Sequence, residues 1–199
     1  MKNTTALNHL QQDVILAPIL AKYEIETNTQ EFDVYLDILD AIVSQQLSLK
    51  AAATIFKRFK ELFSQSVPPI NEILAMPDQE MRTAGLSFQK IKYVKSFAQA
   101  LQDKTLDLDS LKDLSDEEVI TELTKVKGIG RWTAEMILLF SLKREDVFSV
   151  GDLGLRNAVA RLYGIDREDL KQMEEISKKW APHRSLASRY LWKSLEKDS

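Results

Sequence analysis

The sequence predicts an all-α fold of about ten helices. Apolar residues recur at helical spacing along nearly the whole chain, and alternating runs of β-branched residues, which are typical of strands, are few. Only six glycines and five prolines interrupt the 199 residues, so the connections between helices should be short. Because the chain has no internal repeat and no low-complexity linker, we expect one folded unit over residues 1–199.

Capping residues and apolar stripes delimit the expected helices. Ser48, Ser87 and Ser115 each stand directly before a helical pattern, as N-cap residues do. Asp166 is the expected cap of a helix near the C-terminus, and Pro18 either kinks the first helix or opens a second piece. The expected helices span residues 10–23, 31–44, 49–63, 70–75, 78–84, 88–102, 116–126, 131–142, 153–163, 167–180 and 183–196.

The composition excludes several classes of site and partner. With no cysteine, the chain has no disulfide, thiol nucleophile, cysteine zinc site or iron–sulfur cluster, and its two histidines lie too far apart in sequence to suggest a metal cage. We therefore expect no cofactor to be required. No run of eighteen apolar residues offers a membrane span, and no secretory signal is expected at the N-terminus. A net charge of −3 means that any contact with nucleic acid must come from a local basic face.

A turn with two glycines lies at the centre of the segment 123–140, between two helical patterns. Gly128 and Gly130 bracket Ile129, so bare backbone N–H groups stand at the start of a helix. Such an arrangement binds an anionic oxygen, and a phosphate is the expected ligand. The alternative is a tight connection whose glycines only cap the preceding helix.

Charged residues beside this turn favour the first interpretation. Lys125, Lys127 and Arg131 flank it and add positive charge where the backbone already donates. The other basic runs, Lys57-Arg58 and the set Lys90, Lys92 and Lys95, are expected to be solvated helix faces.

Asp152 stands directly before the helical pattern 153–163, and two interpretations use the same geometry. It can be a plain N-cap, which is common for aspartate. It can also be a carboxylate that stabilises positive charge forming on a nearby sugar carbon. Its position one loop after the glycine turn favours the functional interpretation.

Aromatic and amide side chains present similar alternatives. Trp132, Tyr190 and Trp192 are either core residues or the walls of a pocket that stacks on an extruded base. Gln45 and Gln46, at a break between helices, are either a solvated loop or a wedge that fills the gap left by a flipped nucleotide. The sequence alone leaves both pairs of alternatives open.

The segment VKGIGRWTAEMILLFSLKREDVFSVGDLGLRNAV resembles the helix-hairpin-helix and Asp-bearing loop of the DNA glycosylase superfamily. Within that superfamily the chain is most similar to the alkylation-repair branch, the DNA-3-methyladenine glycosylase II type. AIVSQQLSLKAAATI at 41–55, GLSFQKIKYV at 85–94 and RSLASRYLW at 184–192 also resemble this branch. The resemblance covers residues 40–192.

The resemblance implies a role for each motif. Asp152 would be the catalytic carboxylate, Gly128–Gly130 the phosphate grip and Gln46 the intercalating wedge. The base pocket is expected to include Trp132, Met136, Tyr190 and Trp192. The residues expected to contact DNA are Gln45, Gln46, Lys125, Lys127, Gly128, Ile129, Gly130, Arg131 and Thr133. A structural monovalent cation would be held by the backbone carbonyls of Thr124, Val126 and Ile129.

The resemblance also implies two lobes with an active-site cleft between them. The central lobe would span residues 31–147 and carry the hairpin at 123–140, and residues 1–30 with 148–199 would form the other. Three features depart from the superfamily pattern. Trp132 stands where bifunctional members carry a Schiff-base lysine, the iron–sulfur cysteines are absent, and Ser149 replaces a frequent proline. We also see no room for the N-terminal β-domain of longer relatives.

The expected function is therefore hydrolysis of the N-glycosidic bond of alkylated purines, of the 3-methyladenine and 7-methylguanine type, in double-stranded DNA. Such a base already carries positive charge and leaves as a neutral molecule, so one carboxylate suffices where ordinary glycosidases need two. We expect a monomer without lyase activity, in the cytoplasm of a bacterium or the nucleus of a eukaryote. The alternatives are a glycosylase of the same fold for other damaged or mismatched bases, and a non-enzymatic DNA-binding module.

Overall fold

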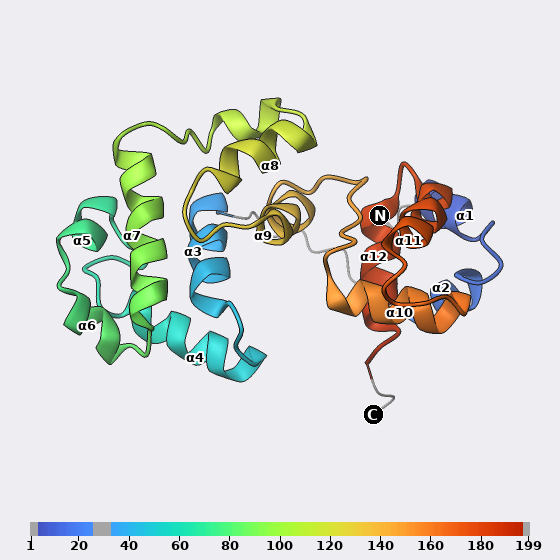
Figure 1. Ribbon diagram of the computed structural model, residues 1–199, viewed down its shortest axis with the longest axis horizontal. Coiled ribbons are helices and arrows are strands. Elements are labelled where there is room, and N and C mark those ends of the chain that lie inside the picture. Colours follow the sequence, from blue (N-terminus) through green and yellow to red (C-terminus); the bar gives the residue numbers. More distant parts are fainter. Residues whose placement is uncertain (1–3, 26–32, 197–199) are drawn as a thin grey trace. The chain divides into compact units, whose positions relative to one another are not determined.

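The computed structural model describes residues 4–25 and 33–196, and within these ranges every regular element is a helix (Figure 1). The all-α prediction is confirmed for this part of the chain, with twelve α-helices in place of about ten. The α-helices are α1 (Thr4–Leu10), α2 (Ala17–Lys22), α3 (Val34–Ser44), α4 (Leu49–Lys60), α5 (Ile70–Ala75), α6 (Asp78–Thr83), α7 (Phe88–Gln102), α8 (Asp116–Thr124), α9 (Arg131–Met136), α10 (Leu153–Tyr163), α11 (Leu170–Ser177) and α12 (Arg184–Lys193). Three short elements are the 3₁₀ turns η1 (Ser110–Asp113) and η3 (Lys178–Trp180) and the π-helical turn η2 (Ile137–Ser141).

The chain divides into two units, each with its own contacts. The central unit is residues 32–142, and the terminal unit combines residues 1–31 with 143–199. In the described part of the central unit, α3 packs against α4, α7 and η2, while α8 packs against α9. In the terminal unit, α12 packs against α10, α2 and η3. No described helix has the length and apolar character that a membrane span requires.

Helix α7 holds the central unit together through its buried face and through two lysines. Ile91, Val94 and Phe97 are fully buried. The Lys90 ammonium donates to the carbonyl of Val43 at 2.7 Å, at the end of α3. Lys95 donates to the Met76 carbonyl at 2.9 Å and forms an ion pair of 2.6 Å with Asp78. The expectation of a purely solvated lysine face is therefore wrong for Lys90 and Lys95, and their ammonium groups complete helix ends that sequence spacing does not reveal.

Asp13, between α1 and α2, is half-buried and binds two aromatic residues of the terminal unit. Its Oδ2 accepts hydrogen bonds from the Tyr163 hydroxyl at 2.7 Å and from the Trp180 indole at 3.0 Å. Its Oδ1 accepts from the backbone N–H groups of Ile15 and Leu16. Burial works against ionisation, but these hydrogen bonds keep the pKa of Asp13 below its usual value.

The same aspartate explains why the expected helix 10–23 is wrong. Its bonds to the backbone of residues 15 and 16 stabilise a turn between Leu10 and Ala17, so α1 ends early. Pro18 then lies in the first turn of α2, where its missing N–H has no cost. Of the two outcomes expected for Pro18, a kink or the start of a second helix, the structure shows the second.

Two further element boundaries differ from expectation. Asp169, not Asp166, caps α11 and accepts from the Gln172 N–H at 3.0 Å, while Asp166 accepts from Glu168 one turn earlier. The expected helix 131–142 remains α-helical only to Met136 and continues as η2, where the Leu142 N–H bonds to the Ile137 carbonyl. Such π turns insert an extra residue and are frequent near functional sites.

Replacing Asp13 is expected to destabilise the terminal unit in a pH-dependent way. Asp13→Ala should lose about 1.5–3 kcal/mol of unfolding free energy at neutral pH, because hydrogen bonds to a charged group disappear. Since the pKa of Asp13 is lower in the folded state than in the unfolded state, its contribution is present above about pH 4 and lost as the pH falls through the folded pKa. Urea unfolding from neutral pH to acid should therefore show the two proteins converging. An equal difference at every pH, or the same loss in the exposed Asp109→Ala control, would contradict this account.

Candidate active site and nucleic-acid interface

The hairpin between α8 and α9 contains two glycines that differ in what requires them. Gly128 has φ +99°, and a Cβ placed on it would lie 2.2 Å from Cγ of Tyr93. Both its backbone and its packing therefore exclude a side chain. Gly130 is the N-cap of α9 with φ −92°, and a Cβ there would meet no described atom within 4 Å. No part of the described fold requires a glycine at 130, whereas a ligand that closely approaches the backbone would. Ile129, between them, is buried and anchors the turn.

Acidic residues pair with two of the three flanking cations. Arg131 forms bidentate hydrogen bonds of 2.6 and 3.1 Å with Glu117 on α8, and a further one of 2.9 Å with the buried Glu135. The bonds to Glu117 raise the pKa of Arg131. Lys125 pairs with Glu122 at 2.7 Å. Both cations thus brace the hairpin within the protein. Glu122 and Glu135 stand at helical spacing from their cations, whereas Glu117 lies 14 positions from Arg131 and no local pattern relates the two.

Other residues predicted for this region lie in different surroundings. Lys127 is exposed beside the two glycines. Thr133 is only 4% exposed, so its side chain is not open to a ligand at the surface. Trp132 is 45% exposed, which removes the alternative that it is a core residue. Met136, one turn later, is half-buried.

The first of the two glutamines after α3 contacts this hairpin. The Gln45 side-chain amide donates to the Gly128 carbonyl at 2.8 Å. Gln46 is exposed and has φ +58°, a left-handed conformation that a side chain disfavours. The structure therefore joins two motifs separated by 83 positions, and the solvated-loop interpretation does not describe Gln45.

Asp152 is both an N-cap and the partner of a tryptophan. Its Oδ1 accepts from the Leu155 backbone N–H at 2.8 Å, as a cap of α10. The same oxygen accepts from the Trp192 indole N–H, also at 2.8 Å. Two donors on one oxygen fix the direction of the carboxylate, and the start of α10 favours its negative charge.

Gly154 leaves room for the hydrogen bond between Asp152 and Trp192. The sequence analysis did not identify this glycine as a site residue. A Cβ at residue 154 would lie 3.0 Å from Asp152 Oδ1 and 3.0 Å from the Trp192 ring. Both groups occupy the space that a side chain would need. The signal was present in the sequence as a glycine two residues after the aspartate, in a helix start where glycine is otherwise unfavourable.

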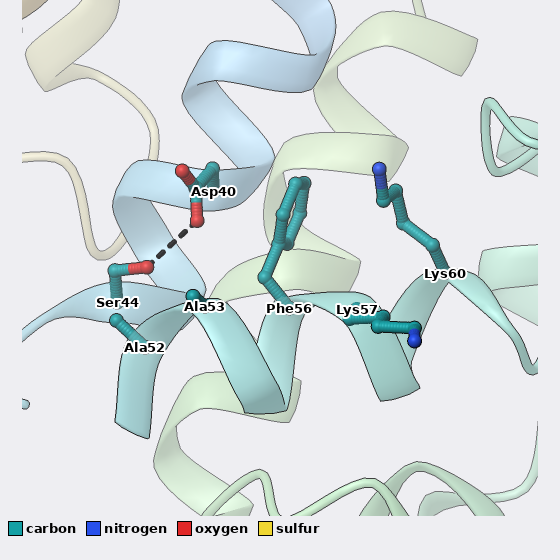
Figure 2. A pocket seen from close by; sticks show the side chains of 7 residues that line it. All are labelled: Asp40, Ser44, Ala52, Ala53, Phe56, Lys57 and Lys60. Carbon is teal, nitrogen blue, oxygen red and sulfur yellow. Dashed lines mark hydrogen bonds between the residues drawn. The ribbon is translucent and has the colours of Figure 1, made fainter. Parts of the chain in front are cut away.

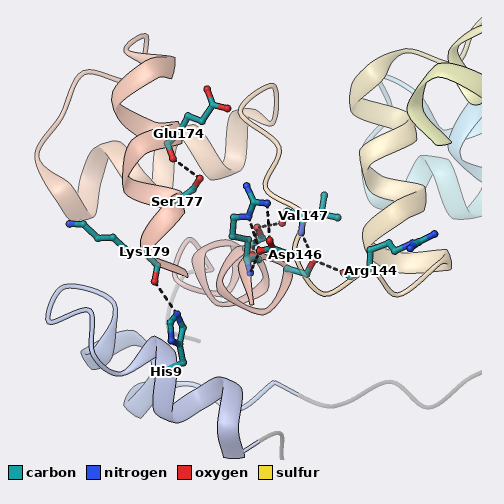
Figure 3. A network of polar contacts seen from close by, with 10 residues as sticks. His9, Arg144, Asp146, Val147, Glu174, Ser177 and Lys179 are labelled. Carbon is teal, nitrogen blue, oxygen red and sulfur yellow. Dashed lines mark hydrogen bonds and ion pairs between the residues drawn. The ribbon is translucent and has the colours of Figure 1, made fainter. Parts of the chain in front are cut away.

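The loop before Asp152 is held by the first turn of α12 (Figure 3). Arg184 forms a bidentate ion pair with Asp146, with distances of 2.7 and 2.9 Å. Although burial works against ionisation, Arg184 keeps the pKa of Asp146 below its usual value. These two residues were also missed, because nothing local in the sequence relates them.

Serines on the same helix complete the attachment of this loop. The Ser185 hydroxyl donates to the Arg144 carbonyl at 2.6 Å and accepts from the Val147 N–H at 2.9 Å. The Ser188 hydroxyl lies 3.3 Å from the Val147 carbonyl. Residues 184, 188 and 192 recur every four positions, so one face of α12 holds both the loop and the carboxylate at its end.

The remaining predicted residues divide between core and backbone roles. Tyr190 is 5% exposed and belongs to the core of the terminal unit with Trp180 and Leu191, so the predicted role in stacking on a base is not supported by its position. Thr124 ends α8, and the Val126 carbonyl accepts from the Ile129 N–H at 3.1 Å.

A separate cavity of about 440 Å³ opens between α3 and α4 (Figure 2). Phe56, Lys57 and Lys60 line it from α4, and Asp40 on α3 accepts from Ser44 at 2.7 Å. None of the predicted site residues lines it.

Residues 39–183 match the family described as HhH-GPD superfamily base excision DNA repair protein. The chain belongs to this superfamily. The DNA-3-methyladenine glycosylase 1 of Schizosaccharomyces pombe is 37% identical over 90% of this chain and 80% of its own length. The putative DNA-3-methyladenine glycosylase YfjP of Bacillus subtilis is 32% identical over 95% of this chain and 70% of its own.

A solved structure of the same superfamily has the same fold. The 3-methyladenine DNA glycosylase Mag1 of S. pombe, in complex with abasic DNA, matches with a TM-score of 0.83 and 36% identity over 96% of each chain. The expected resemblance to alkylation-repair glycosylases is thus confirmed. The two glycines, Asp152 and Trp192 all belong to a base excision repair fold.

The bond between Trp192 and Asp152 has a spectroscopic signature. An indole N–H that donates to a carboxylate gives a displaced proton resonance, so Asp152→Asn and Gly154→Ala should both move the Trp192 indole peak in a ¹H–¹⁵N spectrum. Trp192→Phe assigns that peak. Gly151→Ala is the matched control, because a Cβ there meets only Ser149 Oγ at 3.9 Å. If Gly154→Ala leaves the peak unmoved, or Gly151→Ala moves it as far, the role given to Gly154 is wrong.

Proposed function

We propose that the protein is a monofunctional DNA glycosylase that hydrolyses the N-glycosidic bond of alkylated purines in double-stranded DNA. The observation that carries the proposal is the Asp152 carboxylate, oriented by the Leu155 N–H and the Trp192 indole at 2.8 Å each. The names of the two related glycosylases and the abasic DNA bound to Mag1 support the choice of substrate.

The chemistry requires one carboxylate because the leaving group is already a cation. As the C1′–N bond breaks, its electron pair stays with the alkylated purine and neutralises it, and positive charge develops on the sugar. Asp152 stabilises that charge, a water molecule forms the new C1′–O bond, and Asp152 or solvent takes the proton. Because the carboxylate is already oriented, little reorganisation accompanies the reaction.

The hairpin and the Gln45–Gln46 turn would handle the duplex. The backbone N–H groups of Gly128 and Gly130 grip one phosphate without reading sequence, and exposed Lys127 adds charge beside them. Gln46 enters the stack where the damaged nucleotide leaves it. Backbone contacts of this kind make affinity depend steeply on salt.

Substrate choice rests on two physical filters. A damaged base unstacks more easily than a normal one, and aromatic faces attract its positive charge. The exposure of Trp132 suits it to the second filter. Trp192 donates its indole N–H to Asp152, so its half-buried ring would lie beside the carboxylate where the base is released.

We further propose that the enzyme acts as a monomer on intracellular DNA and needs no cofactor for the reaction. A monovalent cation would suit the backbone carbonyls of Thr124, Val126 and Ile129, since the first ends α8 and the negative end of a helix dipole favours positive charge. Its role would be to stiffen the hairpin.

The test of the main proposal is release of 3-methyladenine and 7-methylguanine from methylated duplex DNA. Asp152→Asn should reduce the rate by about 10²–10³-fold or more and leave binding to abasic DNA unchanged. Asp169→Asn is the matched control, because Asp169 caps α11 in the same way and asparagine is an equally good cap. If Asp152 were only a cap, both variants would be fully active.

Other outcomes would assign a different function. Full activity of Asp152→Asn would exclude the proposed chemistry. Absence of any released base from wild-type protein, with DNA binding intact, would favour a non-enzymatic binding module. Release of hypoxanthine or oxidised bases alone would favour the glycosylase for other lesions.

The identity of residue 132 leads to a separate expectation. Since tryptophan cannot form a Schiff base, borohydride should not trap the protein on DNA during base release, and the abasic strand should stay uncut. A bifunctional glycosylase of the same superfamily serves as the positive control. A trapped complex would show that another amine of this chain attacks the sugar.

A further inference from the structure

Two turns proposed to contact DNA are joined by one direct hydrogen bond. Gln45 follows the last residue of α3, and its side-chain N–H donates to the carbonyl of Gly128 at 2.8 Å. The next residue, Gln46, is the proposed wedge, and Gly128 opens the proposed phosphate grip. The bond therefore links the residue before the proposed wedge to the first residue of the proposed phosphate grip.

The same helix supports both turns. Lys90 on α7 donates to the Val43 carbonyl at 2.7 Å, near the end of α3, and so secures the chain two residues before Gln45. Three positions later on α7, the Tyr93 ring packs so closely under Gly128 that no Cβ fits between them. Residues three apart lie on one face of a helix, so α7 presents both supports side by side.

The conformation of Gln46 requires contacts in addition to those that α7 makes with the two turns. Its φ of +58° is disfavoured for a residue with a side chain, so neighbouring contacts must maintain it. Gln45 lies directly before this position and is half-buried, which fixes its side chain at the hairpin. The Gly128 carbonyl needs a donor, and the amide of glutamine supplies one without adding charge beside a phosphate site.

We propose that Gln45 is a positioning residue that sets the distance between the wedge Gln46 and the phosphate grip at Gly128–Gly130. This inference rests on the proposed function and extends it. When the hairpin binds a phosphate, the Gln45 bond determines where along the strand Gln46 enters. Grip and wedge then act as one rigid element, and the flipped nucleotide is chosen by its fixed distance from the bound phosphate.

The test is a double-mutant cycle between Gln45 and Gln46. Gln45→Met keeps the length of the side chain and removes the donor. Its single-turnover rate of 7-methylguanine release, at saturating enzyme, should fall about five- to tenfold. In a Gln46→Ala background the same change should cause no further loss, because Gln45 then has nothing to position. Gln79→Met, at an exposed site on α6, is the matched control.

A second readout separates this inference from the proposed chemistry. Fluorescence of 2-aminopurine beside a tetrahydrofuran abasic analogue reports insertion of the wedge without any base release. Wild type should raise the signal, and Gln45→Met should lose most of it. If wild type inserts but releases no methylated base, the proposed function fails while the role of Gln45 stands.

Three results would overturn the inference. The first is that Gln45→Met releases 7-methylguanine and raises the 2-aminopurine signal as wild type does. The second is that the losses of Gln45→Met and Gln46→Ala add in the double mutant. The third is that wild type gives no 2-aminopurine signal for insertion. Thermal unfolding checks that each variant folds. If Gln45→Met does not fold, the same measurements on Gln45→Ala decide.

Discussion

The hydrogen bond from the Trp192 indole to Asp152 depends on how α12 is held relative to the start of α10. Residues 152 and 192 are forty positions apart, and their meeting requires α12 to hold a fixed distance from the start of α10. That distance is maintained at the other end of α12, where Arg184, Ser185 and Ser188 bind the loop that leads to Asp152. Gly154 supplies the space between them. The carboxylate is therefore placed by tertiary contacts as much as by its own helix.

Helix starts carry the chemistry in both units. The start of α9 leaves backbone N–H groups at Gly130, and the start of α10 carries Asp152. In the proposed function the same electrostatic property would serve two tasks: one helix end would attract an anion from outside, and the other would stabilise an anion of the protein itself. A protein with a net charge of −3 can bind a polyanion in this way, because the attraction comes from oriented dipoles and a few placed cations.

Local signals in the sequence predicted the all-α class and several of the helix caps. Ser87, Ser115 and Asp152 cap the helices expected of them, since a cap and the first turn it bonds are adjacent in sequence. Partners distant in sequence were beyond such reasoning. The pairing of Arg131 with Glu117, the Arg184–Asp146 pair and the burial of Tyr190 follow from tertiary packing. Asp169 displaced Asp166 as a cap because two candidates lay within one turn and only geometry selects between them.

The contrast between Gly128 and Gly130 has a consequence for how this sequence can change over time. A side chain at 128 collides with Tyr93 and forces an unfavourable backbone, so the damage would appear as misfolded protein and reduced abundance. A small side chain at 130 meets only open space in the described fold, so the chain would still accumulate in its native form. A substitution at 130 should therefore affect binding of the proposed ligand and leave the fold intact. Two glycines that lie two positions apart thus meet different constraints, one from folding and one from the proposed binding of a ligand.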